Sequence, residues 1–404
     1  MHFFFEKLSS IKAQDIVVIE GIYDFDNIAI LLVLWEKKAI TLPCENFELL
    51  KLNIHYDFLI NVNRELLKNH KIKESALNKS LLKGNPGCLF LTSGTSGVPK
   101  IVLHDISKLY SHLQSSRVNN SFLFLKFGHF GGLFTFLKML KSNGVVTVVD
   151  NYNPKYIFSL IDKYSIQLLP VTPTFLSLAN ALGVLNIKEY PSLKYISYGT
   201  EAIAEKLLKE ISRKMPEVKF IQTYGLTEVG VLKTRSTSSE SSFFEFEGEE
   251  FKTRISKNET LEIKMENSSV VQIIEKGINQ PLNEWLDTQD LVEIGESGLR
   301  IISRKSSIIN IAGEKIYPEE VENILLGFKD VAEVKVYGQK NDLVGHLLCA
   351  DIFFVDIELS EKERIKQAIK NYCALYLPSH KIPAKINIEI LNYQDTYNLK
   401  KERF

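Results

Sequence analysis

The sequence predicts the α/β fold class: a large N-terminal domain of α/β sheets with a β element, followed by a small α+β C-terminal domain. Three observations favour this prediction. The chain has 404 residues, more than one hydrophobic core usually supports. Patterns typical of buried strands and amphipathic helices alternate through its first half. After Arg304 a shorter series of helices and strands follows, which indicates a separate unit.

The first half of the chain repeats the order strand, helix, strand. Apolar runs and helical periodicity predict these elements at residues 16–19, residues 27–36 and a run ending at Pro43, and again at residues 144–150, 154–164 and 166–171. Because helices that join strands usually return the chain in the same direction, we expect parallel pairing through right-handed crossovers.

The second half begins with a β pattern. Residues 240–250 are acidic and serine-bearing, and residues 261–264 alternate between apolar and charged, which predicts an antiparallel β element. The C-terminal pattern predicts helices at residues 318–326 and 360–372, and strands at residues 331–337, 347–354 and 385–391. We expect the boundary between the two units near residues 303–306.

Composition and charge exclude several classes of protein. Hydrophobic residues make up 45% and charged residues 24%, as in an ordinary globular protein. Lys plus Arg and Asp plus Glu both number 49, so no overall field favours nucleic acid or an anionic membrane surface. The longest apolar run, residues 28–35, is too short to span a membrane, and the N-terminus lacks a secretion-signal pattern. We expect a cytoplasmic protein with no nucleic-acid or membrane partner.

Residues 91–100 (LTSGTSGVPK) have the composition of an anion-binding loop and follow an apolar stretch. Small hydroxyl residues around glycines let backbone amides and hydroxyls surround one phosphate. The residues that we predict to bind the phosphate are Thr92, Ser93, Gly94, Thr95, Ser96, Gly97 and Lys100. A kinase-type loop would need Ser or Thr after the lysine and a helix starting there, but Ile101 follows Lys100. A plain serine-rich loop is the alternative.

These ten residues resemble the nucleotide loop of the adenylate-forming (ANL) superfamily, which comprises acyl- and aryl-CoA synthetases, luciferase and the adenylation domains that load carrier proteins. Further motifs follow in the order of that family. The resemblance covers nearly the whole chain and is weakest over the first eighty residues, where we expect an N-terminally shortened member. It implies domains at residues 1–303 and 307–404, with a hinge at residues 304–306 about which the small domain is mobile.

Two of these motifs concern the acyl group. Residues 128–135 (GHFGGLFT) resemble the acyl-pocket motif, which implies that His129 lies beside the substrate carboxylate. The alternative is a core or surface histidine next to a glycine hinge. Residues 197–203 (SYGTEAI) resemble a turn that lines adenine and the acyl group, which implies binding roles for Gly199, Thr200 and Glu201. The sequence of this turn is closer to the form found in carrier-protein-loading enzymes than to the form found in many acyl-CoA synthetases.

Two more motifs concern the nucleotide. Residues 221–230 (IQTYGLTEVG) are a near-complete copy of the YGxTE motif, which implies that Tyr224 and Gly225 line the nucleotide, Thr227 bonds a phosphate oxygen and Glu228 holds Mg²⁺. Residues 285–290 (WLDTQD) resemble WxxTGD. They imply that Asp290 binds the ribose hydroxyls and Arg304 the ribose or α-phosphate, with Gln289 and Ser303 where glycines are usual.

The C-terminal part completes the resemblance. Residues 308–322 resemble the loop and helix start that open the mobile domain, with Pro318 early in a helix whose first turn is acidic. Residues 396–403 resemble the T-x-x-GK-x-x-R motif, which implies that Lys400 is the adenylation lysine. Leu399 stands at the usual glycine, and Lys401 is the alternative lysine.

The resemblance implies an ATP- and Mg²⁺-dependent carboxylic acid:thiol ligase that forms acyl-AMP with release of pyrophosphate. The acceptor is the phosphopantetheine thiol of an acyl carrier protein or, alternatively, coenzyme A. Residues 127–134 contain no acidic side chain, which favours a small carboxylic acid with an uncharged acyl or aryl tail, whereas Glu201 would suit an amino acid. The alternative from another class is a non-catalytic nucleotide-binding relative.

Overall fold

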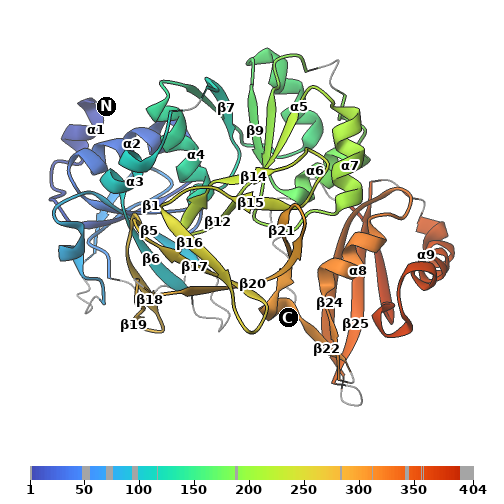
Figure 1. Ribbon diagram of the computed structural model, residues 1–404. Helices are drawn as coiled ribbons and strands as arrows, with labels where there is room; N and C mark the ends of the chain where they lie inside the picture. Colours follow the sequence, from blue (N-terminus) through green and yellow to red (C-terminus); the bar gives the residue numbers. More distant parts are fainter. Residues whose placement is uncertain are drawn as a thin grey trace.

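The computed structural model describes residues 2–47, 55–69, 76–92, 99–115, 117–186, 190–282, 284–311, 313–341, 345–355, 357 and 359–391 (Figure 1). Six of the predicted site residues lie outside the described residues: Ser93, Gly94, Thr95, Ser96, Gly97 and Lys400. Within these ranges the chain forms the mixed α/β architecture that the sequence predicts, with sheet-rich layers followed by a smaller C-terminal unit (Figure 1).

The first sheet has eight strands in the order β19-β18-β6-β5-β2-β1-β3-β4. Its strands are β1 (Ile16–Glu20), β2 (Ile40–Cys44), β3 (Phe58–Ile60), β4 (Leu66–Lys68), β5 (Gly87–Thr92), β6 (Lys100–Asp105), β18 (Val270–Glu275) and β19 (Ile278–Asn279). The helices of this part are α1 (His2–Lys7), α2 (Phe25–Glu36) and α3 (Ile106–His112). Strand β1 pairs in parallel with β2, as predicted from the helix between them.

The second sheet has five strands in the order β11-β10-β9-β7-β8, and its strand pairs are parallel. Its strands are β7 (Asn120–Leu123), β8 (Val145–Val148), β9 (Leu168–Val171), β10 (Tyr195–Tyr198) and β11 (Lys219–Gln222). The helices between these strands are α4 (Phe130–Lys141), α5 (Pro154–Lys163), α6 (Pro173–Ala181) and α7 (Glu205–Lys214). The carboxyl ends of the parallel strands therefore share one edge, where ligands bind in such folds.

The predicted β element is a third, six-stranded antiparallel sheet in the order β14-β15-β21-β20-β17-β16. Its strands are β14 (Thr234–Ser236), β15 (Phe244–Phe246), β16 (Phe251–Ile255), β17 (Thr260–Met265), β20 (Leu286–Gly295) and β21 (Gly298–Arg304). A separate hairpin of β12 (Tyr224–Leu226) and β13 (Gly230–Leu232) precedes it. Strand β18 lies between β17 and β20 in the sequence but pairs with β6, so it links the segment that forms the third sheet to the first sheet.

The C-terminal unit has its own hydrophobic cluster and a three-stranded sheet in the order β24-β25-β26. Its elements are the hairpin β22 (Ile309–Ile311) and β23 (Glu314–Ile316), helices α8 (Pro318–Leu325) and α9 (Lys362–Tyr376), and strands β24 (Val331–Asn341), β25 (Gly345–Phe354) and β26 (Lys385–Ile390). Short 3₁₀ helices lie at Lys79–Leu82, Lys305–Ser307, Leu359–Glu361 and Ser379–Lys381. The hinge at residues 304–306 stays a prediction.

The C-terminal unit packs beneath α6 and α7 (Figure 1). The hydroxyl of Ser177 on α6 donates a buried hydrogen bond of 2.9 Å to the carbonyl oxygen of Ala332 on β24. The ammonium of Lys206 on α7 donates to the carbonyl oxygen of Gly327 at 3.3 Å. Leu178 and Ala332 share a small buried cluster with Leu391. These contacts hold the C-terminal unit against the second sheet's helices in this arrangement.

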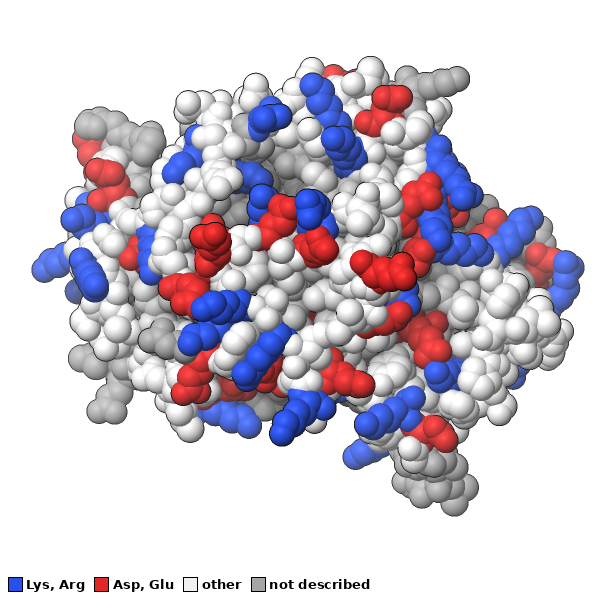
Figure 2. Space-filling view, in the orientation of Figure 1, with Lys and Arg blue, Asp and Glu red and all other residues white. Residues whose placement is uncertain are grey.

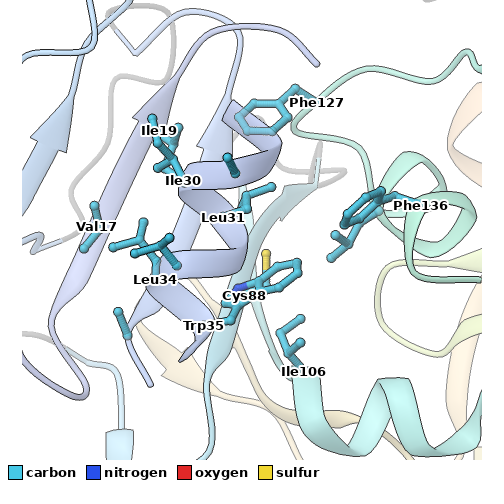
Figure 3. Packing of buried hydrophobic residues seen from close by; sticks show 14 of the residues in the cluster. Val17, Ile19, Ile30, Leu31, Leu34, Trp35, Cys88, Ile106, Phe127 and Phe136 are labelled. Carbon is cyan, nitrogen blue, oxygen red and sulfur yellow. The ribbon is translucent and has the colours of Figure 1, made fainter. Parts of the chain in front are cut away.

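Helix α2 is the centre of the largest core cluster (Figure 3). Asp24 caps its N-terminus, because its carboxylate accepts a hydrogen bond of 2.7 Å from the backbone of Asn27. Leu31 and Leu34 of this helix lie among residues of β1, β5 and α4, with Val17 on one side and Phe136 on the other (Figure 3). The first and second sheets thus share a core.

We predict that Leu34→Ala lowers the free energy of unfolding by about 2–5 kcal/mol, because Leu34 is 0% exposed and its loss leaves a cavity. Urea unfolding followed by circular dichroism measures the change. Phe25→Ala on the same helix is the matched control, since Phe25 is 80% exposed, and we expect a change of less than about 0.5 kcal/mol. Equal losses for the two variants would contradict the assignment of α2 to the core.

Candidate functional site

A cavity of about 1410 Å³ lies where the second sheet, the hairpin β12–β13, the strands β20 and β21 and helix α8 meet. Every predicted site residue within the described ranges lines it, namely Thr92, Lys100, His129, Gly199, Thr200, Glu201, Tyr224, Gly225, Thr227, Glu228, Asp290 and Arg304. On the face of the molecule in Figure 2, basic and acidic side chains lie side by side, in keeping with the zero net charge of the chain. The cavity gathers predicted site residues that are up to 212 positions apart in sequence, from Thr92 to Arg304.

The predicted phosphate loop connects two antiparallel strands. Strand β5 ends at Thr92, which pairs with Lys100, the first residue of β6. A strand rather than a helix therefore follows Lys100, which agrees with the exclusion of a kinase-type loop. The buried hydroxyl oxygen of Thr92 has no hydrogen-bond partner among the described residues. A phosphate oxygen at the mouth of this loop would satisfy that hydroxyl.

Lys100 lies between two carboxylates. Its ammonium nitrogen is 3.9 Å from the Glu228 carboxylate and 3.5 Å from that of Glu275 on β18. Glu275 was not predicted from the sequence, because it belongs to a strand with no recognised motif. The described residues contain no group of three or more metal-ligating side chains. Glu228 nevertheless fits Mg²⁺, which is usually held by one or two carboxylates together with substrate phosphates and water.

Close backbone packing explains two of the glycines. A Cβ atom on Gly225 would lie 2.7 Å from the carbonyl oxygen of Gly230 in the facing strand β13. A Cβ atom on Gly199 would lie 2.5 Å from the hydroxyl oxygen of Thr223. Thr223 in turn bonds the carbonyl oxygen of Tyr198 at the end of β10. Glycine at both positions brings the hairpin β12–β13 against the carboxyl end of the second sheet.

Asp290 connects the two nucleotide motifs. Its carboxylate, 5% exposed, accepts a hydrogen bond of 2.6 Å from the Tyr224 hydroxyl and one of 3.0 Å from the Arg304 guanidinium. Burial and the neighbouring Asp290 charge raise the pKa of Tyr224 well above its ordinary value, so the hydroxyl stays a donor. Burial opposes the charge on Arg304, but Asp290 outweighs it and the pKa of Arg304 is raised. The three side chains form one fixed network.

The residue before Asp290 adopts an unusual conformation. Gln289, at a position where the resemblance leads one to expect glycine, has a φ of 63°. Its backbone amide donates to one oxygen of Asp287 at 2.8 Å, and its side-chain amide donates to the other at 2.6 Å. Two hydrogen bonds to one carboxylate thus hold a left-handed backbone that a glycine would adopt without them.

His129 and Glu201 have structural partners. The Nδ1 atom of His129 accepts a hydrogen bond of 3.1 Å from the backbone of Gly131, so His129 caps α4 while it lines the cavity. The carboxylate of Glu201 accepts a bond of 2.6 Å from the hydroxyl of Thr174 in the first turn of α6. This carboxylate therefore has a structural role at the start of α6 in addition to lining the cavity.

His104 supports the site from behind the cavity wall, and the sequence did not predict it because a single histidine in an apolar strand carries no motif. It is 0% exposed, and its Nε2 atom donates to the carbonyl oxygen of Thr227 at 2.8 Å. Its Nδ1 atom accepts from the Ser269 hydroxyl at 3.0 Å, and its ring stacks on Phe130 with 4.5 Å between centroids. His104 therefore joins β18, the start of α4 and the turn that carries Thr227 and Glu228.

We predict that His104 makes stability fall with acid. Burial lowers the pKa of this imidazole from 6.5 to about 4, although its bond to Thr227 opposes the shift. Between those values the unfolded chain binds a proton that the folded chain does not, so the contribution is complete above pH 6.5 and is lost as pH falls towards 4. The loss is roughly 3 kcal/mol over that window.

Urea unfolding over the same pH range, with His104→Gln beside the unmodified chain, checks this prediction. Glutamine keeps a donor and an acceptor but does not titrate, so the variant should show a shallower dependence on pH. Parallel curves for the two proteins would refute it.

Comparisons with known proteins agree with the motifs. The sequence pattern described as "AMP-binding enzyme" matches residues 29–248, more than half of the chain. The chain is 24% identical over 329 residues to a long-chain-fatty-acid–CoA ligase (FadD13) of Mycobacterium tuberculosis, covering 74% of this chain and 62% of the relative. It is 24% identical over 336 residues to 2-succinylbenzoate–CoA ligase of Bacillus cereus, covering 74% and 65%. The chain thus spans less than two thirds of the length of these curated relatives.

A solved structure has the same fold. It is the O-succinylbenzoate coenzyme A synthetase (MenE) of Bacillus subtilis in complex with ATP and magnesium ion, which matches with a TM-score of 0.71 and 20% identity. The match covers 95% of this chain and 88% of that one. At this level of identity the likeness confirms the two-part α/β architecture.

Proposed function

The chain belongs to the family of AMP-binding enzymes, and we propose from this premise that it is an ATP-dependent carboxylic acid:thiol ligase. It joins a small carboxylic acid to AMP, releases pyrophosphate and then transfers the acyl group to a thiol. The observation that carries the proposal is the Asp290 network, because it joins the two nucleotide motifs in one cavity, which is also lined by Glu228, Lys100 and the start of α4.

Each polar residue of the cavity has a role that its contacts support. Asp290 binds the ribose hydroxyls, since each carboxylate oxygen keeps a further lone pair beyond its bond to Tyr224 or Arg304. Thr92 and Lys100, at the two ends of the phosphate loop, bind phosphate oxygens. Thr227 is held at its carbonyl by His104, which orients its hydroxyl-bearing turn.

Glu228 would hold Mg²⁺, which when bound neutralises charge on the phosphates. The residues of the chain then supply positioning. The resemblance implies that Lys400, which lies outside the described residues, would bridge the acid and the α-phosphate, and that the acid would lie at the start of α4, which His129 caps. Formation of the acyl-AMP breaks the bond between the α- and β-phosphates as the carboxylate oxygen attacks the α-phosphorus, and the electron pair leaves with pyrophosphate.

Coenzyme A is the acceptor that we propose. The resemblance of residues 201–203 slightly favoured a carrier protein, but the curated relatives are named CoA ligases. A carrier protein is the alternative acceptor, and a cytoplasmic location stays a prediction from sequence. No helix among the described residues is long and apolar enough to cross a membrane.

A screen of acid-dependent pyrophosphate release tests the activity. Short, branched, aromatic, dicarboxylic and amino acids are supplied with ATP and Mg²⁺, and thioester formation is then measured with coenzyme A or with a phosphopantetheinylated carrier protein. Thioester formed with coenzyme A supports the proposal. If none of the acids tested gives pyrophosphate release, the non-catalytic, nucleotide-binding alternative is favoured.

We predict that Lys400→Ala lowers acid-dependent ATP–pyrophosphate exchange by about 100-fold or more, because it removes the cation that bridges the two reactants. Thiolysis of a supplied acyl-adenylate should be nearly unchanged, since no phosphate bond breaks in that step. Lys401→Ala is the matched control and should keep both activities. A larger effect at Lys401, or equal loss of both half-reactions at Lys400, would contradict this assignment.

A further inference from the structure

Helix α4 forms one long wall of the cavity. Gly131, Phe134, Thr135 and Lys138 line it, at the spacing that places four residues on one face of a helix. The opposite face of α4, which includes Phe136, is buried in the largest core cluster (Figure 3). The orientation of the helix is therefore set by the core, and Lys138 is directed to the cavity side.

The opposite wall is one face of the second sheet. Alternate residues of its strands line the cavity, namely Leu168, Pro170, Tyr195, Ser197 and Ile221. At the carboxyl edge Val171, Gln222 and Thr223 line it as well. The residues between them, such as Leu169 and Ile196, are fully buried in the cluster on the other face. Because Leu168 and Tyr195 begin their strands, the cavity extends from the carboxyl edge of the sheet to its amino edge.

Lys138 lies at the far end of this cavity. Helix α4 starts beyond the carboxyl end of β7 and returns the chain to the amino end of β8, so Gly131 is near the nucleotide motifs and Lys138 is remote from them. A separation of seven positions corresponds to about 10 Å along the helix axis. Arg117, an exposed residue before β7, adds a second cation to the lining.

Lys138 has no ion-pair or hydrogen-bond partner for its ammonium group among the described residues, although it is half-buried. Of the acidic residues that line the cavity, Glu45 pairs with Lys126 at 2.9 Å and Glu201 accepts from Thr174, and neither forms an ion pair with Lys138 in the described part of the chain. Burial alone lowers the pKa of Lys138, with no anionic neighbour to offset it. A partly buried cation without a partner is costly, and an anion in the cavity would remove that cost.

We propose that Lys138 binds a second carboxylate at the distal end of the acid, so that the preferred substrates are dicarboxylic acids. This inference rests on the proposed function and names its substrate class. It replaces the uncharged tail expected from residues 127–134, a stretch that ends one helical turn before Lys138. The reacting carboxylate lies at the Gly131 end, and the second carboxylate accepts hydrogen bonds from the Lys138 ammonium.

The test compares each dicarboxylic acid from glutaric to suberic acid, and one aryl dicarboxylic acid, with its monomethyl ester. Only acid-dependent ATP–pyrophosphate exchange is measured, without coenzyme A, so the phosphates of coenzyme A cannot be the anion that Lys138 binds. The unmodified chain should favour a diacid over its ester by roughly 10-fold to 100-fold in kcat/KM, the effect of one hydrogen bond to a charged group.

Lys138→Met removes the cation and keeps the apolar stem. We expect it to raise KM for the diacid until the preference for the diacid disappears, and to leave kcat for the ester unchanged. Lys138→Arg, which keeps the positive charge, should keep the preference. Lys155→Met, an exposed charge removal on α5, is the matched control and should keep the preference. Without ligand, Lys138→Met should keep or raise the midpoint of thermal unfolding, because it removes an unpaired, partly buried charge.

Two results would overturn the inference and leave the proposed function standing. The first is equal or better use of the monoesters by the unmodified chain, and the second is an equal loss with diacid and ester in Lys138→Met. If no acid in the full screen gives pyrophosphate release, the proposed function is overturned, and this inference with it.

Discussion

The hydrogen bonds of the Asp290 carboxylate hold the cavity together. One oxygen accepts from Tyr224, which is on the hairpin after the second sheet, and the other accepts from Arg304, which ends the third sheet. Because Asp290 is 5% exposed, loss of either partner would leave a buried charge less well satisfied. The network therefore ties the hairpin that follows the second sheet to strands β20 and β21 of the third sheet.

His104 provides a second, independent link. It is on β6 of the first sheet and bonds the turn between β12 and β13, so the phosphate-loop strands and the Thr227–Glu228 turn move as one body. Its stacking on Phe130 extends the link to the start of α4, which lines the acid side. Nucleotide-binding and acid-binding parts of the cavity are thus coupled through a neutral, buried imidazole.

Much of this arrangement was predictable from sequence because the motifs are local. The strand, helix and strand order of the first half, the antiparallel element and the separate C-terminal unit follow from hydrophobic periodicity, and the motifs identified residues that line one cavity. The contacts between motifs were not predictable, because the partners of Asp290 are 66 and 14 positions away. His104, Glu275 and Lys138 were missed for a related reason: each gains its meaning from residues that only the fold brings near.

The difference between Glu201 and Lys138 illustrates this limit. In the sequence Glu201 was the acidic candidate that would suit an amino acid, and the structure shows that its carboxylate also accepts a hydrogen bond from Thr174 at the start of α6. Lys138 is three residues beyond the motif and looks like an ordinary helical surface residue until α4 is seen to separate a core from a cavity. A sequence motif identifies residue types, whereas the charges that face one another in a cavity are known only from the folded structure.

The central claim is that the cavity around Asp290 binds ATP. A crystal structure of the chain with ATP and Mg²⁺ tests it most directly. The account predicts ribose hydroxyls within hydrogen-bond distance of the Asp290 carboxylate, phosphates between Thr92 and Lys100, and the metal ion on Glu228. A nucleotide bound elsewhere, or a triphosphate remote from Thr92 and Lys100, would contradict it.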